Sequence, residues 1–135
     1  MFNNQWGPHA WYFLHSITFQ YPNNPTENDK KNFYHFFDSL KNILPCPKCR
    51  DHYSQNFIKN PIQLNSRLDL IKWFINIHNQ VNLQTNKKIL SFDEVESIYQ
   101  RKFNYLITEN ESIESNQTML LLFIFILSIY YFLFK

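Results

Sequence analysis

The sequence lacks most of the residues on which turn-rich and disulfide-rich folds depend. It contains one glycine in 135 residues, and its two cysteines are too few for the disulfide framework of a small secreted domain. Its formal net charge of +2 is too small to indicate nucleic acid as the main partner. The chain does not begin with a basic stretch followed by an apolar one, so we expect no secretory signal. These absences favour a protein that is made and kept in a reducing compartment.

Aromatic residues are abundant, at 19%, and together with the scarcity of glycine they favour helices around a bulky core. The apolar periodicity and the capping residues predict an all-α fold of five helices. We expect them at residues 6–20, from Thr26 to just before Pro45, from about Pro47 to residue 57 or 58, after Ser66, and after Ser91. The apolar stripe of the second helix comprises Phe33, Phe36, Phe37, Leu40, Ile43 and Leu44.

The last part of the chain changes character. Residues 1–107 are predicted to form the folded domain, and residues 108–118 form a polar, acidic linker without apolar period. Residues 119–134 are apolar and uncharged, and Lys135 follows them. At about 1.5 Å per residue this run is shorter than the roughly 30 Å hydrocarbon core, although a snorkelling lysine can extend it. We favour a single-pass C-terminal transmembrane anchor, with the domain on the cytosolic side, over a buried terminal helix.

Both cysteines stand in the motif Cys46-Pro47-Lys48-Cys49. The motif has three interpretations: a redox-active dithiol, half of a zinc site completed by His52 and His35, or two unreactive buried thiols. If a helix restarts near Pro47, Cys46 lies at its N-terminus, where backbone N–H groups favour a thiolate. The spacing of the cysteines alone leaves the redox and zinc interpretations open.

Two further patterns place aromatic rings beside histidines. In the first, Trp6-Gly7 is followed by Trp11 and His15, which share a helix face. In the second, Trp73 precedes the stretch His78-Asn79-Gln80-Val81-Asn82. Such a set of rings and amides is able to stack on, and hydrogen-bond to, a planar heterocycle. When each pattern is taken alone, core packing is the better explanation of it.

Taken together, the order WGxxxWxxxH, CxxC and WxxxxHNxVN resembles the Erv/ALR family of FAD-linked sulfhydryl oxidases, in particular the small versions encoded by large DNA viruses. The resemblance runs from Trp6 to about Phe103. It implies a four-helix bundle plus a short fifth helix that encloses FAD. It further implies that a substrate thiol attacks Cys46, that Cys49 faces the flavin, and that the flavin passes electrons to O2 to give H2O2.

The resemblance also implies a set of cofactor-binding residues from four parts of the chain. They are Trp6, Gly7, Trp11, His15, Tyr21, His78, Asn79, Val81, Asn82, Lys87, Lys88 and Tyr99, the last of which stands where many members have a tryptophan. The two lysines fall where the family places a basic residue near the cofactor phosphates.

The partners expected from the resemblance are a thiol-containing protein substrate, such as a thioredoxin-like protein, and O2. Because the chain has no second cysteine pair, substrate must reach Cys46 directly. We expect a non-covalent homodimer, a role in viral disulfide formation, and a location in a host membrane or the virion. The alternative is a zinc-stabilised, membrane-anchored adaptor that uses Cys46, Cys49 and His52.

Overall fold

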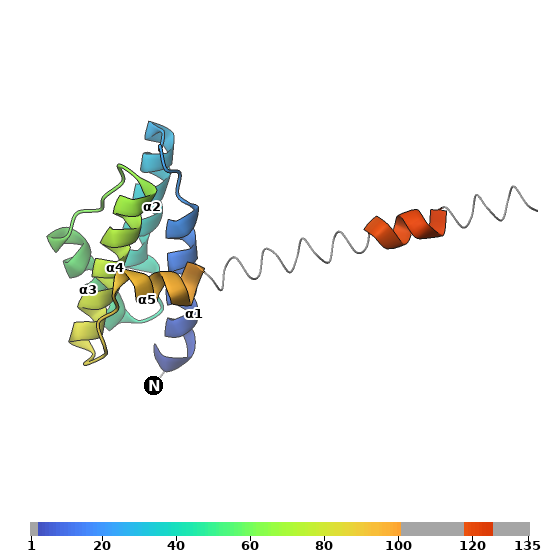
Figure 1. Cartoon of the computed structure of the whole chain (residues 1–135). Helices are drawn as coiled ribbons and strands as arrows, with labels where there is room; N and C mark the ends of the chain where they lie inside the picture. Colours follow the sequence, from blue (N-terminus) through green and yellow to red (C-terminus); the bar gives the residue numbers. More distant parts are fainter. Residues whose placement is uncertain (1–2, 101–117, 126–135) are drawn as a thin grey trace, which may run out of the picture. The chain divides into compact units, whose positions relative to one another are not determined.

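The computed structural model describes residues 3–100 and 118–125. All the regular elements in these ranges are helical, as predicted. Four long helices form a bundle, and a short helical segment lies across it (Figure 1). The elements are α1 (Asn3–Gln20), α2 (Glu27–Ile43), α3 (Pro47–Lys59), α4 (Arg67–Gln84), α5 (Phe92–Val95) and the π-helix η1 (Glu96–Gln100).

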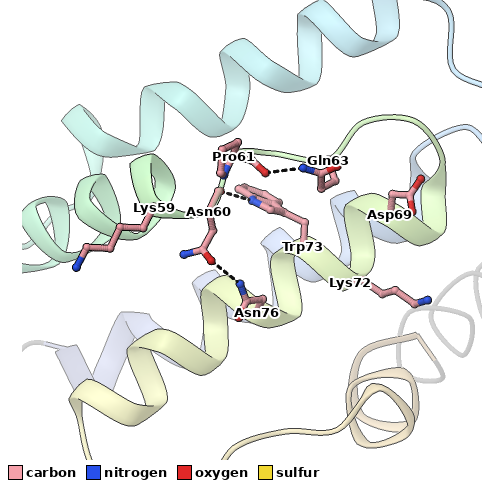
Figure 2. A pocket seen from close by; sticks show the side chains of 8 residues that line it. All are labelled: Lys59, Asn60, Pro61, Gln63, Asp69, Lys72, Trp73 and Asn76. Carbon is pink, nitrogen blue, oxygen red and sulfur yellow. Dashed lines mark hydrogen bonds between the residues drawn. The ribbon is translucent and has the colours of Figure 1, made fainter.

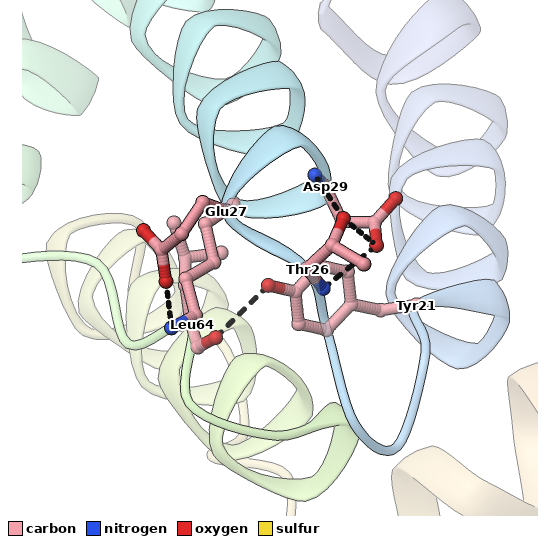
Figure 3. Close-up of polar contacts among 6 residues, drawn as sticks. Tyr21, Thr26, Glu27, Asp29 and Leu64 are labelled. Carbon is pink, nitrogen blue, oxygen red and sulfur yellow. Dashed lines mark hydrogen bonds and ion pairs between the residues drawn. The ribbon is translucent and has the colours of Figure 1, made fainter.

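The capping residues place the helix starts where the sequence predicts them. The Thr26 hydroxyl accepts the Asp29 N–H at 3.2 Å, and the Asp29 carboxylate accepts the Thr26 N–H at 2.9 Å (Figure 3). The Thr26 hydroxyl also donates to the Asp29 carboxylate at 2.6 Å, and this bond, followed by the one from the Thr26 N–H, holds the pKa of Asp29 below its usual value. Ser91 and Glu94 form the same reciprocal capping box at α5. Ser66 caps α4 through the Asp69 N–H, and its own hydroxyl donates to the Asp69 carboxylate.

The core is a cluster of apolar side chains from all four long helices. Phe37, Leu70, Phe74 and Ile77 are completely buried. A second cluster, which includes Phe19, Ile71, Ile75 and Val95, packs α5 against α1 and α4. The prediction is wrong for one residue of the apolar stripe: Ile43 does not lie in the core and is 65% exposed. The helix ends at this residue, and Leu44, the next one, packs against the core in its place.

An open cavity of about 420 Å³ lies beside the end of α3, and several of its lining residues are hydrogen-bonded to one another (Figure 2). The Trp73 indole N–H donates to the Asn60 carbonyl at 2.8 Å, and the Asn76 amide donates to Asn60 Oδ1 at 2.9 Å. Gln63 donates to the Pro61 carbonyl at 3.0 Å. These polar groups tie α3 to α4, and Trp73 is therefore a core residue, as its simpler interpretation predicts.

The segment 118–125 is helical, and its large apolar side chains are exposed. No helix within residues 3–100 or 118–125 has the length and apolar character needed to cross a bilayer. Residues 126–134 of the expected anchor lie outside the described residues, as does most of the expected linker. The anchor therefore stays a prediction.

Candidate functional site

A cavity of about 740 Å³ lies between the first turns of α1, the start of α3, the end of α4 and η1. This volume falls within the roughly 300–1,000 Å³ of pockets that hold cofactors and other small molecules. The predicted cofactor-binding residues that line it are Trp6, Gly7, Trp11, His78, Val81, Asn82, Lys87, Lys88 and Tyr99. The structure thus gathers residues that are up to 93 positions apart in the sequence, from Trp6 to Tyr99.

Aromatic rings from α1, α4 and η1 form one wall of this cavity, the ring wall. The Trp11 indole stacks on the His78 imidazole, with ring centroids 3.7 Å apart and an interplanar angle of 7°. Tyr99 stacks on His15 at 4.2 Å and 21°. Phe74, from the core, meets His15 edge-on at 4.8 Å. The ring wall is thereby continuous with the packed interior, so its orientation is fixed by the fold.

His15 and His78 form a buried pair behind the wall. His15 Nε2 lies 3.0 Å from His78 Nδ1, so one nitrogen donates to the other. Burial, followed by the charge of His78, lowers the pKa of His15 to about 3. Burial, followed by the charge of Lys87, lowers the pKa of His78 to about 4. Both imidazoles are therefore neutral at pH 7, and His15 Nδ1 is buried without a hydrogen-bond partner among the described residues.

The end of α4 turns the following basic loop along the cavity. Asn86 has a positive φ of 54°, a left-handed conformation that asparagine tolerates better than most residues. The Lys87 N–H donates to the Asn82 carbonyl at 2.8 Å, and the Asn86 N–H donates to the Leu83 carbonyl at 3.3 Å. This pair of bonds is a Schellman motif. It ends the helix and sends Lys87 along the cavity rather than around another helical turn.

The dithiol stands at the start of α3. Cys46 is the N-cap residue, and its Sγ accepts the Cys49 N–H at 3.2 Å. A hydrogen bond from a helix N-terminal N–H favours the thiolate form of this sulfur. The Arg50 guanidinium donates to the Leu44 carbonyl at 2.5 Å and so fixes the turn that precedes the motif. Cys49 lines the cavity and Cys46 does not, while both are half-buried.

Three predicted cofactor-binding residues do not line the cavity. Tyr21 follows the last turn of α1, whereas the first turns of that helix form the cavity wall. Tyr21 is completely buried, and its hydroxyl donates to the Leu64 carbonyl at 2.9 Å (Figure 3). His15 lies behind Trp11 and His78. Asn79 bonds to the main chain of Leu90 instead.

Several lining residues are not among the predicted cofactor-binding residues. Lys48 and His52 lie beside Cys49 on α3, at helical spacing that would have placed them there. The others are mostly apolar side chains, and nothing in the sequence separates such a residue from the rest of the core. They include Leu14, Leu40, Leu44, Tyr53, Leu90 and Ile98.

The alternative of a zinc site gains no support. Within residues 3–100 and 118–125, no three side chains of the metal-binding types are close enough together to hold a metal ion. His52 lines the cavity beside Cys49, but neither His35 nor Cys46 lines it with them.

Comparison with known proteins finds relatives that are named FAD-linked sulfhydryl oxidases. The chain is similar to a probable FAD-linked sulfhydryl oxidase of Acanthamoeba polyphaga mimivirus, with 47% identity over 93 residues, 67% of this chain and 65% of that protein. It is 34% identical over 96 residues to an FAD-linked sulfhydryl oxidase of African swine fever virus, covering 71% and 81% of the two chains. The match to ERV1 of Arabidopsis thaliana spans 48% of that protein. The chain thus spans less than two thirds of the mimivirus and plant relatives.

Among solved structures, the chain resembles the FAD-binding domain of Erv1 from Saccharomyces cerevisiae. The TM-score is 0.70 at 29% sequence identity, over 75% of this chain and 96% of that one. The model of the Erv1/Alr family matches residues 8–104. This range includes the dithiol, Trp11 on α1 and the whole of α4. This chain therefore belongs to the Erv1/Alr family.

Proposed function

We propose that this chain is an FAD-dependent thiol oxidase that forms disulfides in protein substrates, with Cys46 and Cys49 as its redox pair. The observation that carries the proposal is the shared cavity of Cys49, Trp11, His78 and Asn82. A dithiol and a preformed ring wall on the same cavity are what electron transfer to a planar cofactor needs. The names of the viral and plant relatives support the same activity.

The site fits FAD on its own features. The Trp11–His78 stack offers a planar surface, and Asn82 adds an amide beside it. Lys87 lines the same cavity, and a lysine ammonium suits a negatively charged pyrophosphate. A Cβ added at Gly7 would meet no atom within 4 Å, so nothing in the chain itself fills the space beside this residue. When bound here, FAD supplies the two-electron chemistry that couples the dithiol to O2 and yields H2O2.

The cysteines divide the thiol chemistry between them. A substrate thiolate attacks Sγ of Cys46 in the oxidised pair, so the Cys46–Cys49 bond breaks and Cys49 leaves as a thiolate. The second substrate thiolate then attacks the first substrate sulfur and releases Cys46. The substrate leaves as a disulfide, having lost two electrons and two protons, and the pair is reduced. Cys49 is then the thiolate that faces the cavity.

The surrounding residues keep this site ordered. His15 and His78 stay neutral because they are buried, so they add no charge behind the ring wall. Tyr53 lines the cavity, as Cys49 does. The Tyr53 hydroxyl donates to the Phe37 carbonyl at 2.9 Å. Burial raises the pKa of Tyr53, so its hydroxyl stays protonated and maintains this bond.

An absorption spectrum of the purified chain tests the proposal. We expect a yellow protein whose flavin band is bleached by dithiol without O2 and restored by O2. Cys49→Ser should bind FAD with less than a two-fold change in affinity, and should lose at least 99% of dithiol-dependent O2 consumption. Cys46→Ser is the matched variant: it should lose turnover with protein dithiols while its flavin stays bound. A folded chain that stays colourless after incubation with FAD would contradict the proposal.

We further propose that the substrates are protein dithiols that reach Cys46 directly, and that they include viral proteins. The half-exposed position of Cys46 at the start of α3 supports direct access. Similarity to the mimivirus and African swine fever virus proteins supports a viral setting. The non-covalent homodimer and the thioredoxin-like partner stay predictions from the family resemblance.

Membrane attachment through residues 119–134 is also proposed. The uncharged run in the sequence supports it, as do the exposed apolar side chains of the helical segment 118–125. On the expected topology, the domain with the dithiol faces the cytosol of the host.

A further inference from the structure

The side chain of Asn79 holds the main chain of the loop that follows α4. Its Nδ2 donates to the Leu90 carbonyl at 2.8 Å, and its Oδ1 accepts the Leu90 N–H at 2.8 Å. The amide thus engages both main-chain groups of one residue, as paired strands do. Asn79 does not line the 740 Å³ cavity, although the sequence motif groups it with residues that do.

The same loop is fixed at its other end by α4 itself. The Lys87 N–H is bonded to the Asn82 carbonyl in the Schellman motif. Two residues, Lys88 and Ile89, lie between this anchor and Leu90. A segment this short between two fixed points has few accessible conformations. Lys87, Lys88 and Leu90 all line the cavity, so the two anchors together define one of its walls.

The two lysines on this wall have different surroundings. Lys88 forms an ion pair with Glu94, the capping residue of α5. Lys87 has no carboxylate partner among the described residues, and it lies close enough to His78 for its charge to act on that imidazole. The wall therefore presents an uncompensated cation beside the Trp11–His78 stack. An uncompensated ammonium at a cavity suits an anionic group of a ligand.

We propose that Asn79 is a positioning residue, which clasps Leu90 and thereby holds Lys87 where it meets the phosphate groups of the bound dinucleotide. The proposal rests on the proposed function for the identity of the ligand. The clasp itself is a property of the chain alone. Asn79 acts on the ligand through Lys87, and it does not touch the ligand.

Hydrogen exchange on the chain without FAD tests the clasp. In Asn79→Ala, the Leu90 amide should exchange roughly ten-fold faster or more, because it loses its acceptor. Asn79→Asp keeps the acceptor and loses the donor, so its Leu90 amide should stay protected. Circular dichroism shows whether each variant folds. If one of them does not, the other still reports on the clasp. Unchanged exchange in Asn79→Ala would overturn the clasp whether or not the chain binds FAD.

A double-mutant cycle on FAD affinity tests the positioning of Lys87. We expect Lys87→Ala and Asn79→Ala each to raise the Kd for FAD roughly ten-fold. The Kd of the double variant should exceed that of either single variant by less than about two-fold. Both single variants should also weaken the salt dependence of the Kd, because each removes the same cation from the phosphates. Multiplicative effects of about 100-fold in the double variant would overturn the positioning role.

Asn76→Ala is the matched control. It removes an amide from the same helix, one that bonds to Asn60 at the smaller cavity instead. Its Kd for FAD and its Leu90 exchange should both stay within two-fold of the wild type, and a larger change in either would overturn the assignment to Asn79. A wild-type chain that binds no FAD contradicts the proposed function and the phosphate contact, whereas the exchange result still decides the clasp.

Discussion

Two neutral imidazoles join α1 to α4 at the cavity. His15 Nε2 and His78 Nδ1 are 3.0 Å apart, and Trp11 and Tyr99 cover one ring each. In this contact one ring nitrogen carries the hydrogen and the other accepts it, so the hydrogen bond forms with both imidazoles neutral. Burial is the main reason that both imidazoles resist protonation, and the charge of His78 adds to it at His15, as the charge of Lys87 does at His78.

Stability should therefore fall as the pH falls below neutrality. The pKa values of His15 and His78 in the folded chain are about 3 and about 4, against an ordinary 6.5. Between pH 6.5 and 4 the unfolded chain binds protons that the folded chain does not, so acid favours unfolding. Each imidazole should remove up to about 1.4 kcal/mol of unfolding free energy per pH unit in this window. Urea unfolding at pH 7, 6 and 5 measures the slope.

His15→Gln should lower that slope to about half, because one of the two groups no longer titrates. His35→Gln is the matched control, since His35 is exposed on α2 and should leave the slope unchanged. A slope that is the same in wild type and His15→Gln would show that the buried pair does not set the acid sensitivity.

Among the helices, α1 carries a residue that its own packing does not require. Gly7 lies within the helix, where glycine is roughly 1 kcal/mol less favourable than alanine. Apart from its two neighbours and the backbone of α1, a Cβ at this position would contact no atom of the chain within 4 Å. Gly7 also lines the cavity. Two physical reasons therefore favour the absent side chain: Pro8 disfavours a Cβ on the helical residue before it, and a ligand in the cavity is able to approach closely here.

Gly7→Ala should consequently separate folding from binding. We expect the unfolding free energy of the chain without FAD to change by less than about 1 kcal/mol, because alanine favours the helix while Pro8 disfavours a Cβ on the residue before it. We expect its Kd for FAD to rise by about ten-fold or more, since the added methyl group occupies space that the ligand needs. Thermal unfolding and flavin-fluorescence titration measure the two effects. Equal FAD affinity in Gly7→Ala and wild type would rule out close contact at this residue.

Residues 3–100 and the helical segment 118–125 differ in whether they bury their large apolar side chains. Residues 3–100 bury their large apolar side chains in two clusters that the four long helices share with α5. The helical segment 118–125 exposes every large apolar side chain it has, from Met119 to Phe125. An exposed apolar run of this kind must find another environment, such as a bilayer.

The full chain should therefore float with phosphatidylcholine vesicles, while residues 1–117 alone should remain at the bottom of the gradient. Phe125→Arg should reduce the bound fraction strongly, because an arginine near the middle of a membrane helix costs roughly 2.5–3.5 kcal/mol, or about 100-fold in partitioning. Phe125→Leu is the control and should float like the wild type. Full-length protein that stays at the bottom would exclude an anchor at residues 119–134.

The sequence by itself determined where α2 to α5 begin and which motifs carry the chemistry, whereas α1 begins three residues before its predicted start. Thr26, Ser66 and Ser91 cap the helices they were predicted to cap, because capping is a contact between residues three apart. The same locality places Cys46 at a helix N-terminus, since Pro45 and Pro47 leave few other starting points.

Only the tertiary structure decided which of the motif residues share a cavity. Trp11 and His78 are far apart in the chain, and their stacking depends on how α1 packs against α4. The family resemblance implies cofactor binding for Tyr21 and Asn79 as it does for Asn82, yet Tyr21 lies in the core and Asn79 clasps Leu90. Local sequence fixes the face of a helix on which a side chain lies, and the packing of whole helices decides what that face meets.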